Sequence, residues 1–126
     1  MDTIHIQAST SYDVIIERNS LPRIGKYLHA IKPPCSVMIV TDDNVGPLYA
    51  STVSDSLQQA GYTVHTYMFP HGESEKNGHR LMDLVETLGN AKLARKDLII
   101  ALGGGVVGDL AGFAAATYLR GIDYVQ

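Results

Sequence analysis

A chain of 126 residues, 45% of them hydrophobic, is long enough to bury the core of one domain. Its formal net charge of -3 at pH 7 provides no positive field that would attract nucleic acid or an anionic membrane. The single cysteine, Cys35, excludes an internal disulfide and a cysteine-rich zinc site. We find neither a long apolar run nor a signal peptide, and we therefore expect a cytoplasmic protein.

The N-terminal part of the chain predicts a β-hairpin followed by a helix. Residues 3–7 and 12–17 are rich in β-branched side chains and are separated by small polar residues, which indicates a hairpin at the edge of the fold. Ser20 can cap a helix that ends at the pair Pro33-Pro34. The apolar residues of this helix recur at the spacing of one buried face: Ile24, Tyr27, Leu28 and Ile31.

Strands and helices then alternate to the end of the chain. Apolar runs at 36–41, 62–69 and 97–102 predict buried strands, and residues 124–126 resemble the start of another. Helices are expected from Pro47 to Gly61, around residues 81–94, and from Gly108 to Leu119, where the helix is apolar nearly all round. This order predicts an α/β fold with a doubly wound, mostly parallel, Rossmann-like sheet and an N-terminal hairpin.

A glycine-rich turn between a buried strand and a helix is the strongest candidate for a ligand site. It carries five glycines, Gly103, Gly104, Gly105, Gly108 and Gly112. Strand, glycine turn and helix start expose backbone N–H groups and the positive end of a helix dipole to a phosphate. The alternative is that the glycines only allow a tight turn and a close helix contact.

The same glycines satisfy the G-x-G-x-x-G spacing of dinucleotide-binding turns, at positions 103, 105 and 108. Asp123 lies where the ribose-binding acid of that motif would be sought. It stands at the start of a predicted strand, however, whereas the usual ribose acid lies at a carboxyl end. We therefore do not expect Asp123 to bind the ribose.

Two further polar clusters follow the preceding strands. Asp42 and Asn44 could hold the hydroxyls of a ribose, although Asp43 or Asn44 could instead cap the next helix. In the segment Gly72-Glu73-Ser74-Glu75-Lys76, Lys76 offers a cation and Glu73 an acceptor, although a solvated loop is the alternative. Because the carboxyl ends of parallel strands meet at one edge of a sheet, these clusters and the glycine turn predict one crevice.

Asp109 and Arg120 admit two interpretations each. Asp109, near the helix start, could accept hydrogen bonds from a ribose hydroxyl or stabilise the helix N-terminus. Arg120, after the buried helix, could complement the helix dipole or clamp a phosphate or carboxylate. The five histidines share no metal-ligand spacing, so we expect no metal ligands among them; His71, beside the Gly72 loop, is the least secure of these.

Four motifs in this order resemble the 3-dehydroquinate synthase family of sugar-phosphate cyclases. They are Thr41-Asp42-Asp43-Asn44-Val45, Gly72-Glu73 with Lys76, the run GGGVVGDLAGF at 103–113, and Tyr118-Leu119-Arg120-Gly121. Iron-type alcohol and glycerol dehydrogenases also have a triple-glycine turn followed by an acid, but typically place a lysine after the next alanine. Here Gly112-Phe113 follows Ala111, which favours the synthases.

The resemblance implies an enzyme that converts 3-deoxy-arabino-heptulosonate 7-phosphate into 3-dehydroquinate and phosphate in the shikimate pathway, towards chorismate and the aromatic amino acids. It implies catalytic NAD and a divalent metal, zinc or cobalt, in the Lewis-acid role. It also implies a homodimer. The sequence does not exclude the substrate of a related cyclase, because the residues that distinguish these substrates mostly lie downstream.

The resemblance also assigns roles residue by residue. Asp42 and Asn44 match positions that hold the adenosine end of NAD, and Gly72, Glu73 and Lys76 match a cofactor-contacting loop. The pyrophosphate turn and nearby ribose contacts match Gly104, Gly105, Val106, Val107, Gly108 and Asp109. Arg120 matches an arginine that contacts substrate in the partner subunit's site, whereas His71 departs from the acidic residue often found there.

Residues 1–126 are thus expected to be an NAD-binding N-terminal domain, without the helical second domain that carries the metal ligands. Such a truncated chain should be inactive alone. The alternatives are a stand-alone nucleotide-binding module and a relative of the iron-type dehydrogenases.

Overall fold

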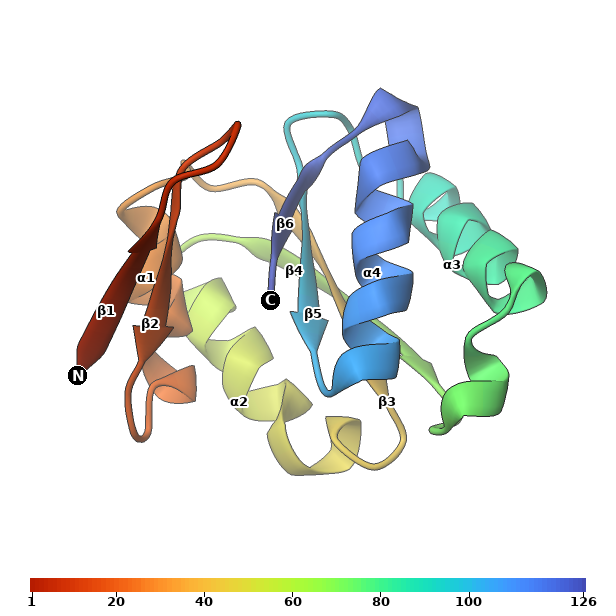
Figure 1. The fold of residues 1–126 in the computed structure, drawn as a ribbon, viewed down its shortest axis with the longest axis horizontal. Coiled ribbons are helices and arrows are strands. Elements are labelled where there is room, and N and C mark those ends of the chain that lie inside the picture. Colours follow the sequence, from red (N-terminus) through yellow and green to blue (C-terminus); the bar gives the residue numbers. More distant parts are fainter.

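Four parallel strands form the centre of the protein in the computed structural model, which describes residues 1–126 (Figure 1). They are β3 (Ser36–Asp42), β4 (Thr63–Phe69), β5 (Leu98–Leu102) and β6 (Asp123–Val125), arranged in the order β4-β3-β5-β6. In the register of the sheet, Val37 pairs with both Val64 and Leu98. The apolar runs at 36–41 and 97–102 therefore occupy the interior of the sheet, and β4 and β6 form its edges.

Two pairs of helices cover the two faces of this sheet. Side chains alternate along β3, so that Val37 and Ile39 pack with α1 (Ile24–His29) and α2 (Gly46–Gln59). Met38 and Val40 pack on the other face with α3 (Gly78–Asn90) and α4 (Gly105–Thr117). Short 3₁₀ turns complete the chain: η1 (Leu21–Arg23), η2 (Glu73–Glu75) and η3 (Tyr118–Arg120). The predicted doubly wound α/β fold is confirmed.

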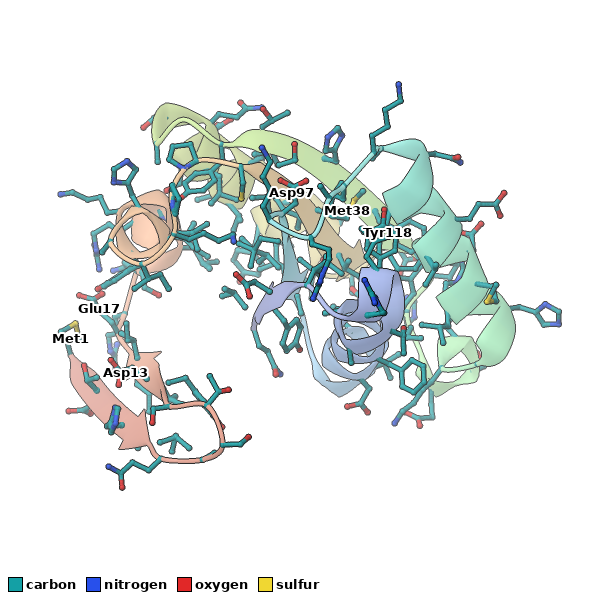
Figure 2. The ribbon with its side chains drawn as sticks, turned by 90° about the horizontal axis from the view of Figure 1, so that it is seen from above. Met1, Asp13, Glu17, Met38, Asp97 and Tyr118 are labelled. Atoms are coloured by element: carbon teal, nitrogen blue, oxygen red, sulfur yellow. The ribbon has the colours of Figure 1, made fainter.

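The N-terminal hairpin, β1 (Asp2–Ile6) and β2 (Tyr12–Ile16), forms a sheet of its own beside α1 (Figures 1 and 2). It is not an edge of the main sheet. One face of the hairpin is apolar and largely exposed, and consists of Ile4, Ile6, Tyr12, Val14 and Ile16. The Glu17 carboxylate, at the end of the hairpin, accepts a hydrogen bond from the Tyr27 hydroxyl and pairs with Arg23 at 3.0 Å.

Several helix boundaries differ from the sequence prediction, and α3 ends at Asn90 rather than near residue 94. Helix α4 begins at Gly105 rather than Gly108, because Gly104 serves as its N-cap without any side-chain hydrogen bond. Helix α1 ends at His29, and Ile31, which was assigned to its buried face, is 78% exposed. None of the helices combines the length and apolar character that crossing a membrane would require.

Candidate functional site

The turn between β5 and α4 leaves an open surface above a helix N-terminus. The backbone N–H groups of Gly105, Val106 and Val107 have no acceptor within the chain. A Cβ added at Gly104 or Gly105 would meet no atom within 4 Å, whereas one at Gly103 would lie 2.8 Å from Val107 Cγ2. Tight packing therefore accounts for Gly103 but not for the next two glycines, and the unpaired N–H groups are suited to an anionic ligand.

Gly108 lies on the side of α4 that packs against β6. A Cβ at this position would lie 2.9 Å from the amide nitrogen of Gln126. The Tyr124 hydroxyl donates to the Gly108 carbonyl at 3.0 Å. For Gly108 the structure supports the close-packing interpretation of the glycine.

Lys76 connects the loop after β4 with α4. Its Nζ lies 2.7 Å from Asp109 Oδ2 and 3.4 Å from Glu73 Oε1. The hydrogen bond to the Asp109 carboxylate raises the pKa of Lys76, so this amine is charged at neutral pH. The side chains of Lys76 and Asp109 are 41% and 60% exposed, and a ligand can therefore reach both.

Gly72 sets the direction of the loop that carries Glu73 and Lys76. Its φ of 114° lies in the left-handed region that favours glycine, and the 3₁₀ turn η2 starts at the next residue. The amide of Lys76 then donates to the Glu73 carbonyl at 3.0 Å. The backbone thus brings the Glu73 and Lys76 side chains to the same side of the loop, close enough to pair.

The loop after β3 is held by Asp42. Its Oδ1 accepts hydrogen bonds from the backbone amides of Asn44, at 3.0 Å, and Val45, at 2.8 Å. The sequence suggested Asp43 or Asn44 for the cap of α2, but the N-cap residue is Val45 and no side chain caps the helix; the Asp42 carboxylate instead closes the turn that precedes it. The second Asp42 oxygen and the Asn44 side-chain amide form no hydrogen bond within the chain, so they are available to a ligand.

The Asp43 carboxylate points to the loop after β4, and sequence reasoning missed this contact. Its Oδ1 accepts from the backbone amide of His71 at 2.8 Å and lies 2.6 Å from Nδ1 of the same residue. No local spacing predicts such a pair, because the two residues follow different strands. The only available indication was the position of His71 beside Gly72.

Strand order explains why these loops meet. The chain passes from β3 outward to β4 and then returns to β5 on the other side of β3, so the connections diverge between β3 and β5. At such a switch point the crevice outside the carboxyl ends is the usual ligand site of an open α/β sheet. The Thr41 hydroxyl donates to the Leu102 carbonyl at 2.7 Å and ties the two strand ends together there.

Arg120 and Asp123 lie away from this edge. Asp123 pairs with Leu98 at the amino ends of the strands, and its carboxylate lies 2.8 Å from Lys32 Nζ. Arg120 precedes β6, with a φ of 65°, and forms no ion pair within the chain. The structure therefore brings the other predicted residues to one edge but leaves Arg120 at the opposite end of the sheet.

No group of three or more His, Cys, Asp and Glu side chains is arranged to hold a metal ion. His5 lies 2.7 Å from Asp13 in the hairpin, and Cys35 is a half-buried free thiol whose pKa is raised by burial. These groups are remote from one another in the fold and do not converge.

Comparison with known proteins identifies relatives of this chain. Residues 66–126 match the family model described as 3-dehydroquinate synthase N-terminal. The 3-dehydroquinate synthase of Streptococcus suis (strain 05ZYH33) is 48% identical over 118 residues, which are 94% of this chain and 33% of that enzyme. The chain therefore spans about a third of the length of the curated relatives it matches.

Solved structures show the same fold. A 2-deoxy-scyllo-inosose synthase superposes with a TM-score of 0.85 at 25% identity, over 98% of this chain and 35% of that one. A 2-epi-5-epi-valiolone synthase from Streptomyces hygroscopicus subsp. jinggangensis 5008, solved with NAD+ and Zn2+ bound, has a TM-score of 0.78 at 25% identity, over 96% of this chain and 33% of that one. By its sequence motifs and by these matches, the chain is similar to the N-terminal part of 3-dehydroquinate synthases.

Proposed function

We propose that residues 1–126 form the NAD-binding part of a 3-dehydroquinate synthase. The observation that carries this proposal is the open turn at Gly104 and Gly105, where three N–H groups at the start of α4 are unpaired and Lys76 pairs with Asp109 of the same helix. A pyrophosphate needs such donors, together with a nearby cation and no intervening Cβ. The open space at Gly104 and Gly105 leaves room for this group.

Each part of the site has a distinct task in holding the cofactor. The amides of Gly105, Val106 and Val107 would donate to the pyrophosphate, and Lys76 would supply a positive charge there. Asp42 and Asn44 would accept or donate at the adenosine ribose, while Gly72, Glu73, Gly104, Gly108 and Asp109 line the same edge. When bound, NAD supplies a hydride acceptor for a substrate hydroxyl. This chain's contribution is to bind and orient it.

The activity of the whole enzyme is the conversion of 3-deoxy-arabino-heptulosonate 7-phosphate into 3-dehydroquinate and phosphate, in the cytoplasm and in the shikimate pathway. The cyclase relative solved with NAD+ and Zn2+ supports a divalent metal, zinc or cobalt, for the reaction. Residues 1–126 offer no fitting ligand set, so we assign the metal ligands to a part of the enzyme outside these residues.

Arg120 has its proposed role in a homodimer. Its position at the far end of the sheet separates it from the cofactor site of its own subunit. We infer that its guanidinium contacts the substrate acid or phosphate bound by the partner subunit. Replacement by Lys in the full-length enzyme should raise KM while NAD affinity is unchanged, and equal effects on both would contradict this assignment.

Calorimetric titration of the protein with NAD tests the proposed site. We expect binding, and we expect Gly104→Ala to weaken it by at least about tenfold, since a methyl group blocks the donors without touching other atoms of the protein. The melting temperature should be unchanged. Gly89→Ala is the matched control, because a Cβ there also meets no atom within 4 Å but lies in α3. Absence of heat at millimolar NAD would contradict the proposal.

A turnover assay tests the assignment of the remaining chemistry elsewhere. Residues 1–126 with NAD, zinc and the heptulosonate phosphate should release no phosphate, because no metal ligand set is present among them. Measurable phosphate release would contradict this assignment, because it would show that residues 1–126 catalyse the reaction by themselves. Product analysis of the full-length enzyme separates a cyclase, which gives 3-dehydroquinate, from a dehydrogenase, which gives a ketone and reduced NAD.

A further inference from the structure

One carboxylate and one imidazole join the two loops that follow β3 and β4. Asp43 Oδ1 accepts the backbone N–H of His71 at 2.8 Å and lies 2.6 Å from its Nδ1. In return, the Asp43 amide donates to the Phe69 carbonyl at 3.0 Å. These contacts continue beyond the last pair of the sheet register, Asp42 with Phe69. The two loops are therefore fastened to each other after the strands have ended.

The residues on either side of this pair belong to the proposed cofactor site. Asn44 follows Asp43, and Gly72 and Glu73 follow His71. Neither Asp43 nor His71 is itself assigned to NAD. Any displacement of one loop relative to the other would separate the ribose-binding side chains of the first loop from the Glu73 and Lys76 side chains of the second.

We propose that Asp43 and His71 are positioning residues, a latch that fixes the spacing of the two cofactor loops and holds more tightly when His71 is protonated. This inference rests on the proposed function, because the loops are assigned to NAD there. A charged imidazolium donates a stronger hydrogen bond to a carboxylate than a neutral ring does. NAD affinity should accordingly rise as pH falls through the range in which imidazoles titrate, about pH 5 to 8.

The other charged groups of these loops are already engaged. Lys76 pairs with Glu73 and Asp109, and Asp42 caps the loop before α2, whose first turn has no acidic residue. No second carboxylate or cation lies within hydrogen-bond distance of the His71 ring. The His71 and Asp43 side chains are 57% and 49% exposed, so protons exchange freely with solvent.

The carboxylate partner does not titrate in the same range. The His71 side chain, followed by its backbone amide, holds the pKa of the Asp43 carboxyl below its ordinary value. Asp43 therefore stays ionised at pH values above the ordinary aspartate pKa and remains the acceptor of the latch there.

Four variants test the latch by NAD titration across this pH range. Asp43→Ala should weaken NAD binding about three- to tenfold, the loss expected for one or two exposed hydrogen bonds. His71→Gln keeps a donor but cannot be charged, and Asp43→Asn keeps an acceptor without charge. Both should retain most of the affinity and lose the pH dependence. His79→Gln, an exposed histidine on α3, is the matched control and should follow the wild type.

Each outcome separates the latch from the proposed function. If the wild type binds NAD and the variants bind it equally well with the same pH profile, the latch is overturned and the NAD site stands. A pH dependence that survives in Asp43→Asn would mean that His71 acts on NAD directly, which also overturns it. An absence of NAD binding by the wild type sinks the proposed function.

A second measurement needs no cofactor. In the ligand-free protein, backbone NMR resonances of Asn44 and Gly72 should shift together with a single pH midpoint, because protonation of His71 is transmitted through Asp43. In Asp43→Ala the Asn44 resonance should lose this dependence while Gly72 keeps it. An Asn44 resonance that ignores pH in the wild type would disprove the latch, whatever the NAD titration gives.

Discussion

Asp97 is a buried carboxylate that joins the starts of β3 and β5. It is 3% exposed, and its two oxygens accept from the amides of Ser36, at 2.9 Å, and Ala94, at 2.6 Å (Figure 2 labels Asp97). Asp97→Ala leaves both amides without an acceptor and should lower the free energy of unfolding by about 2–4 kcal/mol. Asp97→Asn keeps one acceptor and should cost about half as much.

Urea denaturation at neutral pH measures these losses. The exposed Asp55 of α2 provides the control, because Asp55→Ala removes the same atoms from a carboxylate that binds no amide. Equal losses at the two positions would mean that the hydrogen bonds of Asp97 contribute nothing.

The Asp43 carboxyl provides a pH dependence at the residue scale. Its pKa is lowered chiefly by the His71 side chain, so the pair stabilises the folded protein above the unfolded pKa of about 3.9. That stabilisation is lost as pH falls through the lower, folded-state pKa. Carboxyl NMR titration should give Asp43 a midpoint below the ordinary aspartate value, and His71→Ala should raise it only part of the way, since the backbone N–H stays. An unchanged midpoint would refute the assigned cause.

At the scale of elements, α1 and α2 touch at a point that only glycine permits. The Gly25 amide donates to Ser56 Oγ at 2.9 Å, and a Cβ on Gly25 would overlap the Ser56 carbonyl. We expect Gly25→Ala to destabilise the protein by about 1–3 kcal/mol, despite the better helix propensity of alanine. Gly89→Ala, where a Cβ is unopposed, should be neutral or stabilising. Thermal melts compare the two, and a stabilised Gly25→Ala would refute the contact.

The elements differ in how far the sequence predicts them. Strands β3 and β5 follow from compact apolar runs, because such runs have no other place to be buried. The start of α4 could not be predicted, since Gly104 caps it without a side chain and leaves no recognisable residue type. The Asp43–His71 contact depends on the register between β3 and β4, which no local pattern encodes.

At the scale of the whole molecule, the N-terminal hairpin is less well stabilised than the α/β body. β1 and β2 pair only with each other, and an isolated two-stranded hairpin is marginally stable in water. Amides of the hairpin should therefore exchange with deuterium well before those of β3 and β5. Hydrogen exchange followed by mass spectrometry measures this. Glu17→Ala, which removes the tie to Tyr27, should widen the difference, and equal protection of hairpin and sheet would contradict it.

The position of β3 also has a consequence for how fast the protein folds. This strand lies between β4 and β5, and its pairing with β5 joins Val37 to Leu98 across the intervening α2, β4 and α3. One edge of this buried strand therefore stays open until a distant part of the chain arrives. Such long-range parallel pairing forms slowly, because the chain loses conformational entropy in closing the long loop before the strand contacts can stabilise it. During synthesis, β3 is the segment in greatest need of protection from wrong partners.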